Sequence, residues 1–379
     1  MQDTAILARD AARRIPSIAP PVLTIVIPTI NERDNVEPLV ELLMSTLREV
    51  AWEAIFVDDD SRDGTSERVR ALARSNPQIR CLQRIGRRGL ATACIEGVLA
   101  CAAPYVAVMD ADLQHDERLL PEMLRTLESG AADLVVGSRY AAGGGFGELS
   151  RGRARLSELG TRLARVVCKA EVADLLSGFF MCRREIFEQA LRRMSGQGFK
   201  VLLDLLASSP EPVRVCELPY NFRQRQHGES KLDTMIAWEF AMLLADKLIG
   251  HIVPVRFALF AMIGAIGLLV HLVMLWLSLN LFGLGFAAAQ SVATMVAMTS
   301  NFFFNNQFTY RDQRLRGLTL LRGLLIFYLI CGVGAVANVG IASYAFTSSH
   351  TWWLAGVAGA IVGSVWNFAM SSVFTWRRR

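Results

Sequence analysis

The sequence predicts an α/β domain with a mostly parallel sheet and flanking helices, followed by an all-α membrane domain of four transmembrane helices. In the first half, short apolar runs alternate with helical patterns of about 10–15 residues, which is typical of βαβ units. In the second half, the two runs 257–310 and 323–376 contain no Asp, Glu, Lys or Arg. Each run has room for two spanning helices of about 20 residues and a turn.

The amino-acid composition also limits which classes of protein are possible. The 379 residues are enough for two or three domains, and 52% of them are hydrophobic, more than is usual in a soluble protein. The seven cysteines show no CxxC spacing, which indicates reduced thiols and neither a disulfide framework nor a zinc site. Residues 1–20 carry five charged side chains and no apolar run, so we interpret them as an N-terminal arm and not as a signal peptide.

The elements of the α/β domain follow from the alternation of apolar runs and turns. The run 22–28 predicts a first strand that ends at Pro28, and the run 54–57 predicts a second. Further strands are expected at about 79–84, 105–109, 133–137, 177–182 and 213–219. Helices are expected at about 36–50, 65–75, 89–102, 117–129, 201–208 and 233–250.

The last of these helices is amphipathic and directly precedes the membrane domain. We therefore expect the region 232–252 to lie at the membrane interface, with an ordinary domain helix as the alternative. The α/β domain then spans 21–231 and the membrane domain 253–379.

Carboxylates cluster where the expected strands end. Glu32 follows the first strand, 58–60 the second, and Asp110 and Asp112 the fourth. The carboxyl ends of parallel strands form the ligand-binding edge of such a sheet, and carboxylates gathered there repel one another unless a cation or sugar hydroxyls engage them. Neither G-x-G-x-x-G nor G-x-x-x-x-G-K-[ST] is present, which argues against a dinucleotide-binding dehydrogenase and a P-loop NTPase.

Asp110, Asp112 and Gln114 alternate along the chain at the end of the fourth strand. Carboxylate and amide oxygens are ligands that suit Mg²⁺ or Mn²⁺, and such a metal would bind a diphosphate. The alternative is that Asp-Ala-Asp only caps the helix that begins near Glu117.

Two basic segments follow. Arg151, Arg153 and Arg155 precede Ser157, and arginine binds phosphate bidentately; a solvated charge run is the alternative. A second cationic loop extends over 223–231.

The membrane half contains an internal repeat with an offset of 66 residues. Asn301-Phe302 and 308–311 return as Asn367-Phe368 and 374–377. Spans are predicted at about 257–279, 287–309, 324–346 and 353–375. Four arginines and one aspartate lie at 311–322 between the second and third spans, so the positive-inside rule predicts a multi-pass protein with the α/β domain and both termini in the cytoplasm.

Seven motifs in order resemble one known family. They are Ile27-Pro28-Thr29-x-Asn31-Glu32, Val57-Asp58-Asp59-Asp60-Ser61, Arg88-Gly89-Leu90, Met109-Asp110-Ala111-Asp112-Leu113-Gln114-His115, Gly137-Ser138-Arg139-Tyr140, Ser177-Gly178-Phe179 and Gly228-Glu229-Ser230-Lys231. In this respect the chain resembles the dolichol-phosphate mannose synthases, family 2 glycosyltransferases of GT-A fold. The repeated hairpins resemble the GtrA-like membrane domain that is sometimes fused to them.

The resemblance implies metal-dependent, inverting transfer of mannose from GDP-mannose to dolichyl or polyprenyl monophosphate, with no nucleic-acid partner. Asp110, Asp112 and Gln114 would bind Mg²⁺ or Mn²⁺. Catalysis and acceptor binding would involve Asp112, Arg139, Arg153 and Ser157. The positions expected to contact the donor nucleotide sugar are Pro28, Ile30, Glu32, Val57, Asp59, Asp110, Ala111, Asp112, Gln114, Arg139, Arg225 and Lys231.

One departure from the family and two alternatives stay open. Ile30 stands where the family usually has tyrosine beside the nucleotide base, so a UDP-sugar is the alternative donor. The Gln-x-x-Arg-Trp motif of processive synthases is absent, which favours transfer of a single sugar. A lipid flippase or membrane scaffold with a degenerate α/β domain is the non-enzymatic alternative, and the sequence does not indicate an oligomeric state.

Overall fold

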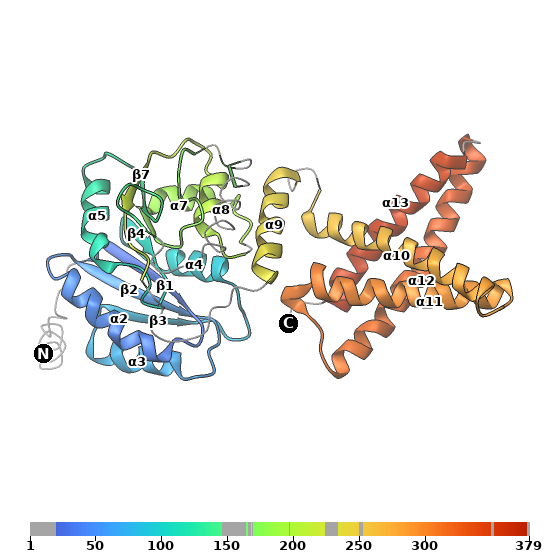
Figure 1. The fold of residues 1–379 in the computed structure, drawn as a ribbon, viewed down its shortest axis with the longest axis horizontal. Coiled ribbons are helices and arrows are strands. Elements are labelled where there is room, and N and C mark those ends of the chain that lie inside the picture. The colour runs from blue at the N-terminus through green and yellow to red at the C-terminus, as the bar shows by residue number, and fades with distance from the viewer. Residues whose placement is uncertain are drawn as a thin grey trace, which may run out of the picture. The chain divides into compact units, whose positions relative to one another are not determined.

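A seven-stranded sheet forms the centre of the N-terminal half in the computed structural model (Figure 1). The structure describes residues 20–145, 164–165, 168, 170–196, 198–223, 234–249, 253–349 and 352–376. The strands are β1 (Leu23–Thr29), β2 (Trp52–Asp58), β3 (Ile79–Gln83), β4 (Tyr105–Val108), β5 (Leu134–Ser138), β6 (Phe180–Arg183) and β7 (Val215–Pro219). Their order in the sheet is β3-β2-β1-β4-β6-β5-β7.

All strand pairs are parallel except those of β6, which runs antiparallel to both β4 and β5. The expected fold class, a mostly parallel sheet with flanking helices, is therefore confirmed. The late strand expected at 177–182 is shorter and lies later, at Phe180–Arg183, and the sequence pattern did not show that it is reversed.

Helices cover both faces of the sheet. Helices α2 (Arg33–Thr46), α3 (Thr65–Ser75) and α5 (Leu120–Glu128) pack on one face. Helices α4 (Leu90–Leu99), α7 (Arg184–Leu191) and α8 (Val201–Ser208) pack on the other. Along β1, Ile25 and Ile27 belong to the first apolar layer and Val26 to the second. Burial on both faces explains why the strands read as continuous apolar runs.

Most predicted elements are present, with shifted ends. Helix α2 begins at Arg33 and not near 36, and a 3-10 turn at Glu117–Leu119 supplies the first part of the helix expected at 117–129. Helix α7 was not predicted. It starts directly after β6, with no turn residues between them to mark its beginning.

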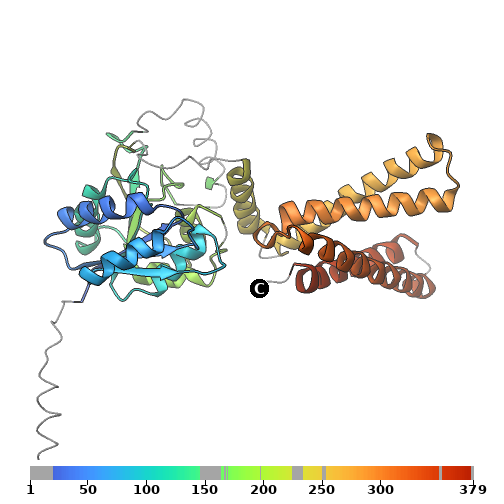
Figure 2. The same cartoon turned by 90° about the horizontal axis from the view of Figure 1, so that it is seen from below.

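The C-terminal half consists of two helical hairpins, coloured orange and red in Figure 2. The first joins α10 (Val255–Asn280) to α11 (Phe286–Phe304), and the second joins α12 (Leu318–Ser349) to α13 (Trp352–Met370). Helices α11 and α13 each continue as a π-helical turn, at Asn305–Thr309 and Ser371–Thr375. Judged by length and composition over the described residues, α10 is the one helix that could cross a membrane, while Leu318–Gly334 and Ile361–Thr375 are shorter apolar stretches.

The two π-helical turns pair reciprocally. The ring of Tyr310 stacks on that of its repeat equivalent Trp376, with centroids 4.2 Å apart. Trp376 Nε1 donates to Asn306 Oδ1 at 3.0 Å, and the hydroxyls of Tyr310 and Ser372 are 2.6 Å apart. Because Asn306 and Ser372 are themselves 66 positions apart, each repeat bonds to the same position of the other. Equivalent positions of the two sequence repeats therefore make equivalent hydrogen bonds to each other.

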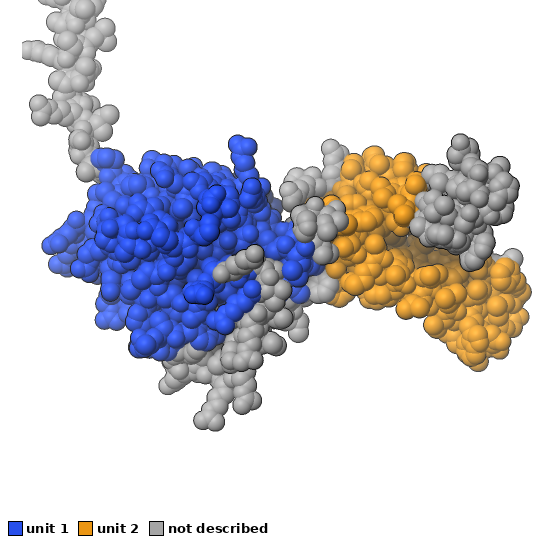
Figure 3. Space-filling view, turned by 90° about the horizontal axis from the view of Figure 1, so that it is seen from above, with its two compact units in different colours: residues 1–248 blue, residues 249–379 orange. Residues whose placement is uncertain are grey.

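The chain divides into two compact units, residues 1–248 and 249–379 (Figure 3). Helix α9 (Thr234–Ile249) belongs almost entirely to the first. Leu243 of α9 lies in the apolar layer formed by α4, α7 and α8, and Lys247 Nζ is 2.6 Å from the fully buried Asp204 carboxylate of α8. The second half of α9 is therefore packed as a domain helix, and the location of the region 232–252 at a membrane interface remains a prediction.

Candidate active site

The acidic strand ends meet at one edge of the sheet. β1 lies between β2 and β4, and the carboxyl ends of such parallel strands form the ligand-binding edge of the sheet. Glu32 follows β1, Asp59 follows β2, and Asp110 and Asp112 follow β4. The structure thus brings together three groups of carboxylates that are far apart in the sequence.

Unusual backbone conformations mark the same edge. In the described part of the chain, the non-glycine residues with positive φ are Asn31 (53°), Asp60 (58°) and Leu113 (63°). Each lies within five residues of the end of a different strand, β1, β2 or β4. Left-handed backbone costs on the order of 1–2 kcal/mol for a residue such as Leu113, while Asn and Asp adopt it more readily, and strain of this kind clusters at ligand sites. The clustering is an indication of function that does not depend on the side chains.

The ends of β1 and β2 are joined by local hydrogen bonds. The amide of Asn31 donates to Ser61 Oγ at 2.8 Å, and Asn31 Oδ1 accepts from the amide of Arg62 at 3.0 Å. Glu32 Oε2 accepts from Asn35 Nδ2 at 2.6 Å. These bonds fix the predicted donor positions at the end of β1.

Pro28 and Val57, two further predicted donor positions, are paired neighbours in the β1–β2 ladder. Ile30 is half-buried directly after β1, and Ala111 is buried between the two aspartates.

Asp59 is engaged within the protein. One carboxylate oxygen accepts from Arg84 Nη1 at 2.5 Å and the other from the amide of Gly89 at 2.7 Å. Burial raises the pKa of Asp59, while the Gly89 amide and Arg84 oppose that shift. If Asp59 also contacts the donor, its carboxylate must do so while it accepts hydrogen bonds from Arg84 and Gly89.

The end of β4 presents the predicted metal ligands. Asp112 is 6% exposed and its Oδ1 accepts from the amide of Gln114 at 3.2 Å, whereas the side chain of Asp110 is 40% exposed. Gln114 Nε2 donates to the carbonyl of Arg223 at 3.0 Å, so Oε1 is the amide atom suited to a cation. Among the described residues, no three His, Cys, Asp or Glu side chains converge. The donor set fits a hard cation that also takes oxygens from a ligand.

His115 supports this turn, although the sequence analysis gave it no role. Its ring stacks on Phe179 with centroids 5.1 Å apart, and its Nδ1 accepts from the amide of Asp110 at 3.1 Å. Burial lowers the pKa of His115 to about 4, so the imidazole is neutral at pH 7. We interpret it as a packing group that orients Asp110.

Arg139 is held by a partner that the sequence analysis missed. Its Nε and Nη2 donate to the two carboxylate oxygens of Asp174, each at 2.7 Å, and its amide donates to the same group at 3.1 Å. Asp174 is fully buried, and Glu217 on β7 accepts from the amides of Ala173 and Asp174. The guanidinium of Arg139 is thus fixed in one orientation. Asp174 lies in an apolar segment, and no motif drew attention to it.

Arg223 anchors the second cationic segment. It donates to Glu117 at 2.6 Å and to Asp116 at 2.7 Å, and its amide donates to the carbonyl of Gln114. The predicted residues beyond this anchor, Arg225 and Lys231, lie outside the described residues, as do Arg153 and Ser157.

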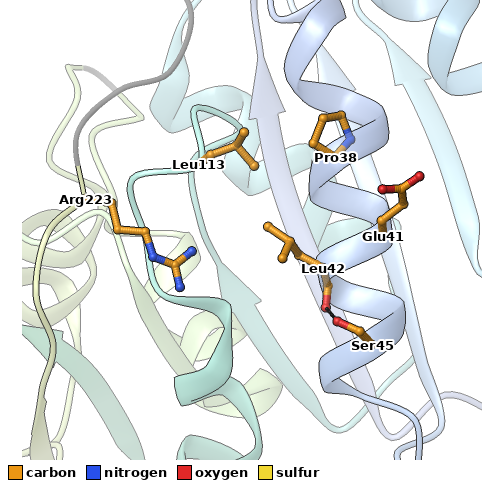
Figure 4. Close-up of a pocket in the computed structure, with 6 residues that line it drawn as sticks. All are labelled: Pro38, Glu41, Leu42, Ser45, Leu113 and Arg223. Atoms are coloured by element: carbon orange, nitrogen blue, oxygen red, sulfur yellow. Dashed lines mark hydrogen bonds between the residues drawn. The ribbon is translucent and has the colours of Figure 1, made fainter.

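A cavity of about 360 Å³ lies beside the site, between α2 and the turn after β4. It is lined by Pro38, Glu41, Leu42, Ser45, Leu113 and Arg223 (Figure 4). It contains none of the predicted metal, donor or acceptor residues. The candidate site is therefore the open edge formed by the strand ends, and this cavity is its neighbour.

Comparisons with known proteins cover both halves of the chain. Residues 24–191 match the family described as glycosyl transferase family 2, and residues 259–376 match the family described as GtrA/DPMS, transmembrane domain. The dolichol-phosphate mannosyltransferase of Pyrococcus furiosus is 30% identical over 93% of this chain and 99% of its own length. That of Saccharomyces cerevisiae is 34% identical over 59% of this chain and 85% of its own length.

Among solved structures, glucosyl-3-phosphoglycerate synthase of Mycobacterium tuberculosis is similar at 20% identity, with a TM-score of 0.44 over 60% of this chain and 80% of that one. Similarity at this level does not bear on substrates.

Proposed function

Because this chain belongs to the dolichol-phosphate mannosyltransferases, a group of family 2 glycosyltransferases, we propose that it transfers mannose from GDP-mannose to dolichyl or polyprenyl monophosphate. The observation that carries the proposal is the similarity to the Pyrococcus furiosus enzyme, which extends through both units. The match to a transmembrane domain makes the chain a membrane protein. We also propose that the site faces the cytoplasm and that transfer inverts the configuration at the anomeric carbon of the sugar.

The end of β4 is the proposed donor site. Asp112 and the Gln114 amide would hold Mg²⁺ or Mn²⁺, and Asp110 would contact it directly or through water. A bound divalent cation would offset the negative charge that develops on the leaving diphosphate. The hydrogen bonds of His115 and Arg223 support this function because they fix the turn that carries the three side chains.

Arg139 is proposed to position the acceptor. A phosphate monoester is already largely ionised at pH 7, so no protein group has to deprotonate the attacking oxygen. The residues must instead align the two substrates, and alignment is effective only if the aligning groups are held still. The paired hydrogen bonds from Asp174 supply that rigidity. Arg153 and Ser157 would complete the acceptor site.

The segment that begins at Arg223 is proposed to cover the donor diphosphate. Arg225 and Lys231 would contact its phosphates. The ion pairs of Arg223 with Asp116 and Glu117 would keep the start of this segment beside the turn after β4.

The test is a donor panel with purified full-length protein and one polyprenyl phosphate. We expect transfer of radiolabelled mannose from GDP-mannose to the lipid, and loss of that transfer in excess EDTA. Transfer from a UDP-sugar in its place would favour the second candidate, which rests on Ile30 at the position of the usual tyrosine. Absence of transfer from every donor would overturn the enzymatic proposal and favour a flippase or scaffold.

A further inference from the structure

One short segment, 174–179, contacts two groups of the proposed site, Arg139 and Asp110, and a lysine that has no role in it so far. Asp174 pairs with Arg139. The carbonyl of Leu176 accepts a hydrogen bond from Lys200 Nζ at 3.3 Å. A Cβ added to Gly178 would lie 3.2 Å from Asp110 Oδ2, so this glycine abuts the carboxylate. The segment therefore places Lys200, which no motif indicated, in the neighbourhood of Arg139 and Asp110.

The surroundings of Lys200 differ from those of Lys247, the other lysine among the residues that the structure describes. Lys247 Nζ lies 2.6 Å from Asp204, 2.8 Å from Ser208 Oγ and 3.1 Å from the carbonyl of Arg193. For Lys200, the Leu176 carbonyl is the one acceptor among the described residues, and none of their carboxylates lies within 4 Å. The ammonium of Lys247 thus has an anionic partner within the fold, while that of Lys200 has a neutral one.

Lys200 is half-buried, and an ammonium group that loses part of its hydration without gaining an anionic partner is destabilised. Burial and the charge of Arg139 lower the pKa of Lys200, while Asp174 and Asp110 oppose that shift. Lys200 is also the N-cap residue of α8, where the helix dipole disfavours a cation and favours an anion. Each of these unfavourable electrostatic contributions decreases when an anionic group binds beside Lys200.

We propose that Lys200 is a further substrate-binding residue whose ammonium contacts the phosphate of the polyprenyl phosphate acceptor. The inference rests on the proposed function and names an additional residue of the same site. Asp174 already neutralises the guanidinium of Arg139, so that ion pair brings no net positive charge to the phosphate. Lys200 adds a positive charge to the one that Arg153 would bring. Its location beside the Arg139–Asp174 pair, which the proposed function gives to the acceptor, assigns it to the acceptor.

The experiment compares Lys200→Met with Lys247→Met in the full-length protein. Losing one charge-assisted contact should raise the KM for polyprenyl phosphate by about 10- to 100-fold in Lys200→Met. Donor affinity, measured by titration calorimetry with GDP-mannose, should stay within about twofold. Lys200→Arg should recover part of the loss because it restores the charge. Lys247→Met should lower the unfolding temperature and leave the lipid KM unchanged, since its partner is Asp204.

Two results would overturn the assignment. A lipid KM within about twofold of wild type in folded Lys200→Met would show that the residue does not bind the acceptor. Weaker donor binding with an unchanged lipid KM would show that the ammonium serves the donor diphosphate. If Lys200→Met does not fold, the same measurements apply to Lys200→Gln and Lys200→Arg.

A binding measurement separates this proposal from the proposed function. Binding of a short-chain polyprenyl phosphate to detergent-solubilised full-length wild type and Lys200→Met is measured by titration calorimetry, with phosphatidylglycerol as the anionic control ligand. If wild type transfers no sugar but prefers polyprenyl phosphate to phosphatidylglycerol and the variant does not, Lys200 binds the acceptor and the proposed reaction is wrong. Equal preference in both proteins contradicts the role of Lys200.

Discussion

Arg139 and Asp174 form an ion pair whose side chains are 15% and 0% exposed. Removing one member of a buried pair costs about 3–5 kcal/mol because the other charge is left uncompensated. Arg139→Ala should therefore lose stability and activity together, and by itself it cannot tell a binding residue from a structural one. The double change Arg139→Met with Asp174→Leu removes both charges and should regain most of the unfolding temperature.

The role of Arg139 is decided by the activity of that double variant. We expect it to unfold near the wild-type temperature and to have lost about 10- to 100-fold in kcat/KM for the lipid, which is the scale of a lost charge-assisted contact. Thermal unfolding and lipid kinetics measure the two effects separately. Near-normal kinetics in the stable double variant would show that Arg139 only holds the segment 174–179 in place.

The prediction of a divalent metal site rests mainly on Asp112 and Gln114. Asp112→Asn and Gln114→Ala should each lower kcat by about 100-fold or more, because each removes stabilisation of charge in the transition state. Their unfolding temperatures should change little, since both side chains lie in a turn and neither belongs to the apolar layers of the sheet. Asp133→Asn is the control, because Asp133 pairs with Arg214 just before β5, at the opposite edge of the sheet. Full turnover of Asp112→Asn, or of wild type in excess EDTA, would contradict the metal assignment.

Sequence reasoning found those parts of the site whose residues lie close together along the chain. Asp110, Asp112 and Gln114 are neighbours along the chain, and the end of a strand predicts where they lie. Asp174 and Lys200 reach the same place only because β6 is inserted between β4 and β5. No periodicity encodes that order. An isolated aspartate among apolar residues and a lysine at a helix start were the only signals available.

At the level of helices, the membrane hairpins depend on two glycines. A Cβ at Gly267 would overlap the side-chain amide of Asn301, and a Cβ at Gly334 would overlap that of Asn367. Small residues let transmembrane helices approach closely. Gly267→Ala should therefore destabilise the first hairpin by about 1–3 kcal/mol, the usual cost of overpacking, although alanine is the better helix former.

A matched control lies on the same helix. Gly264 has no atom within 4 Å of an added Cβ, so Gly264→Ala should leave the unfolding temperature in detergent unchanged or raise it. Adding Asn301→Ala to Gly267→Ala should relieve the overlap and restore stability. Equal effects of the two single alanine substitutions would mean that the helices do not pack at Gly267.

Helix α9 decides where the first unit ends. The predicted boundary at 231 separates Lys247 from Asp204, a buried pair joined by the fold. A chain shortened to residues 1–231 should be less stable than one of residues 1–250 by about 3–5 kcal/mol, because the Asp204 carboxylate loses its cation. Denaturant titration of the two chains measures the difference. Equal midpoints would show that α9 is dispensable for the unit and would favour the interfacial interpretation.

Sequence patterns located the helices and strands but did not show the direction of every strand or where every helix packs. Burial on both faces of the sheet produced the apolar runs that identify β1, β2, β4 and β5, whereas the edge strands β3 and β7 are only partly buried. The reversal of β6 left no trace in its four residues, since an antiparallel strand buried on both faces has the same composition as a parallel one. For α9, hydrophobic residues on one face fit both a membrane interface and the apolar layer of α8. The burial of Leu243 in that layer and the Lys247–Asp204 contact distinguish the two interpretations.

At the level of the whole molecule, the open question is how the second unit crosses the membrane. Helix α10 has 26 residues, or about 39 Å at 1.5 Å per residue, which exceeds a hydrocarbon core of about 30 Å. With its π-helical turn, α11 has a similar length, from Phe286 to Thr309. Arg314 and Phe282, which lie beyond opposite ends of α11, are both exposed, so they can report on which side each connection lies.

We predict four spans with the arginine-containing connection in the cytoplasm. In cells that express a variant with its native cysteines replaced by alanine, Phe282→Cys should react with a membrane-impermeant maleimide from outside. Arg314→Cys should react only after the membrane is opened, because the positive-inside rule holds its neighbourhood in the cytoplasm. The repeat extends the argument to the second hairpin, since two helices per repeat return the chain to the same side. Labelling of Arg314→Cys in intact cells would invert the topology. Labelling of both positions from one side would mean that α11 does not span, and that the second unit lies at the membrane surface in part.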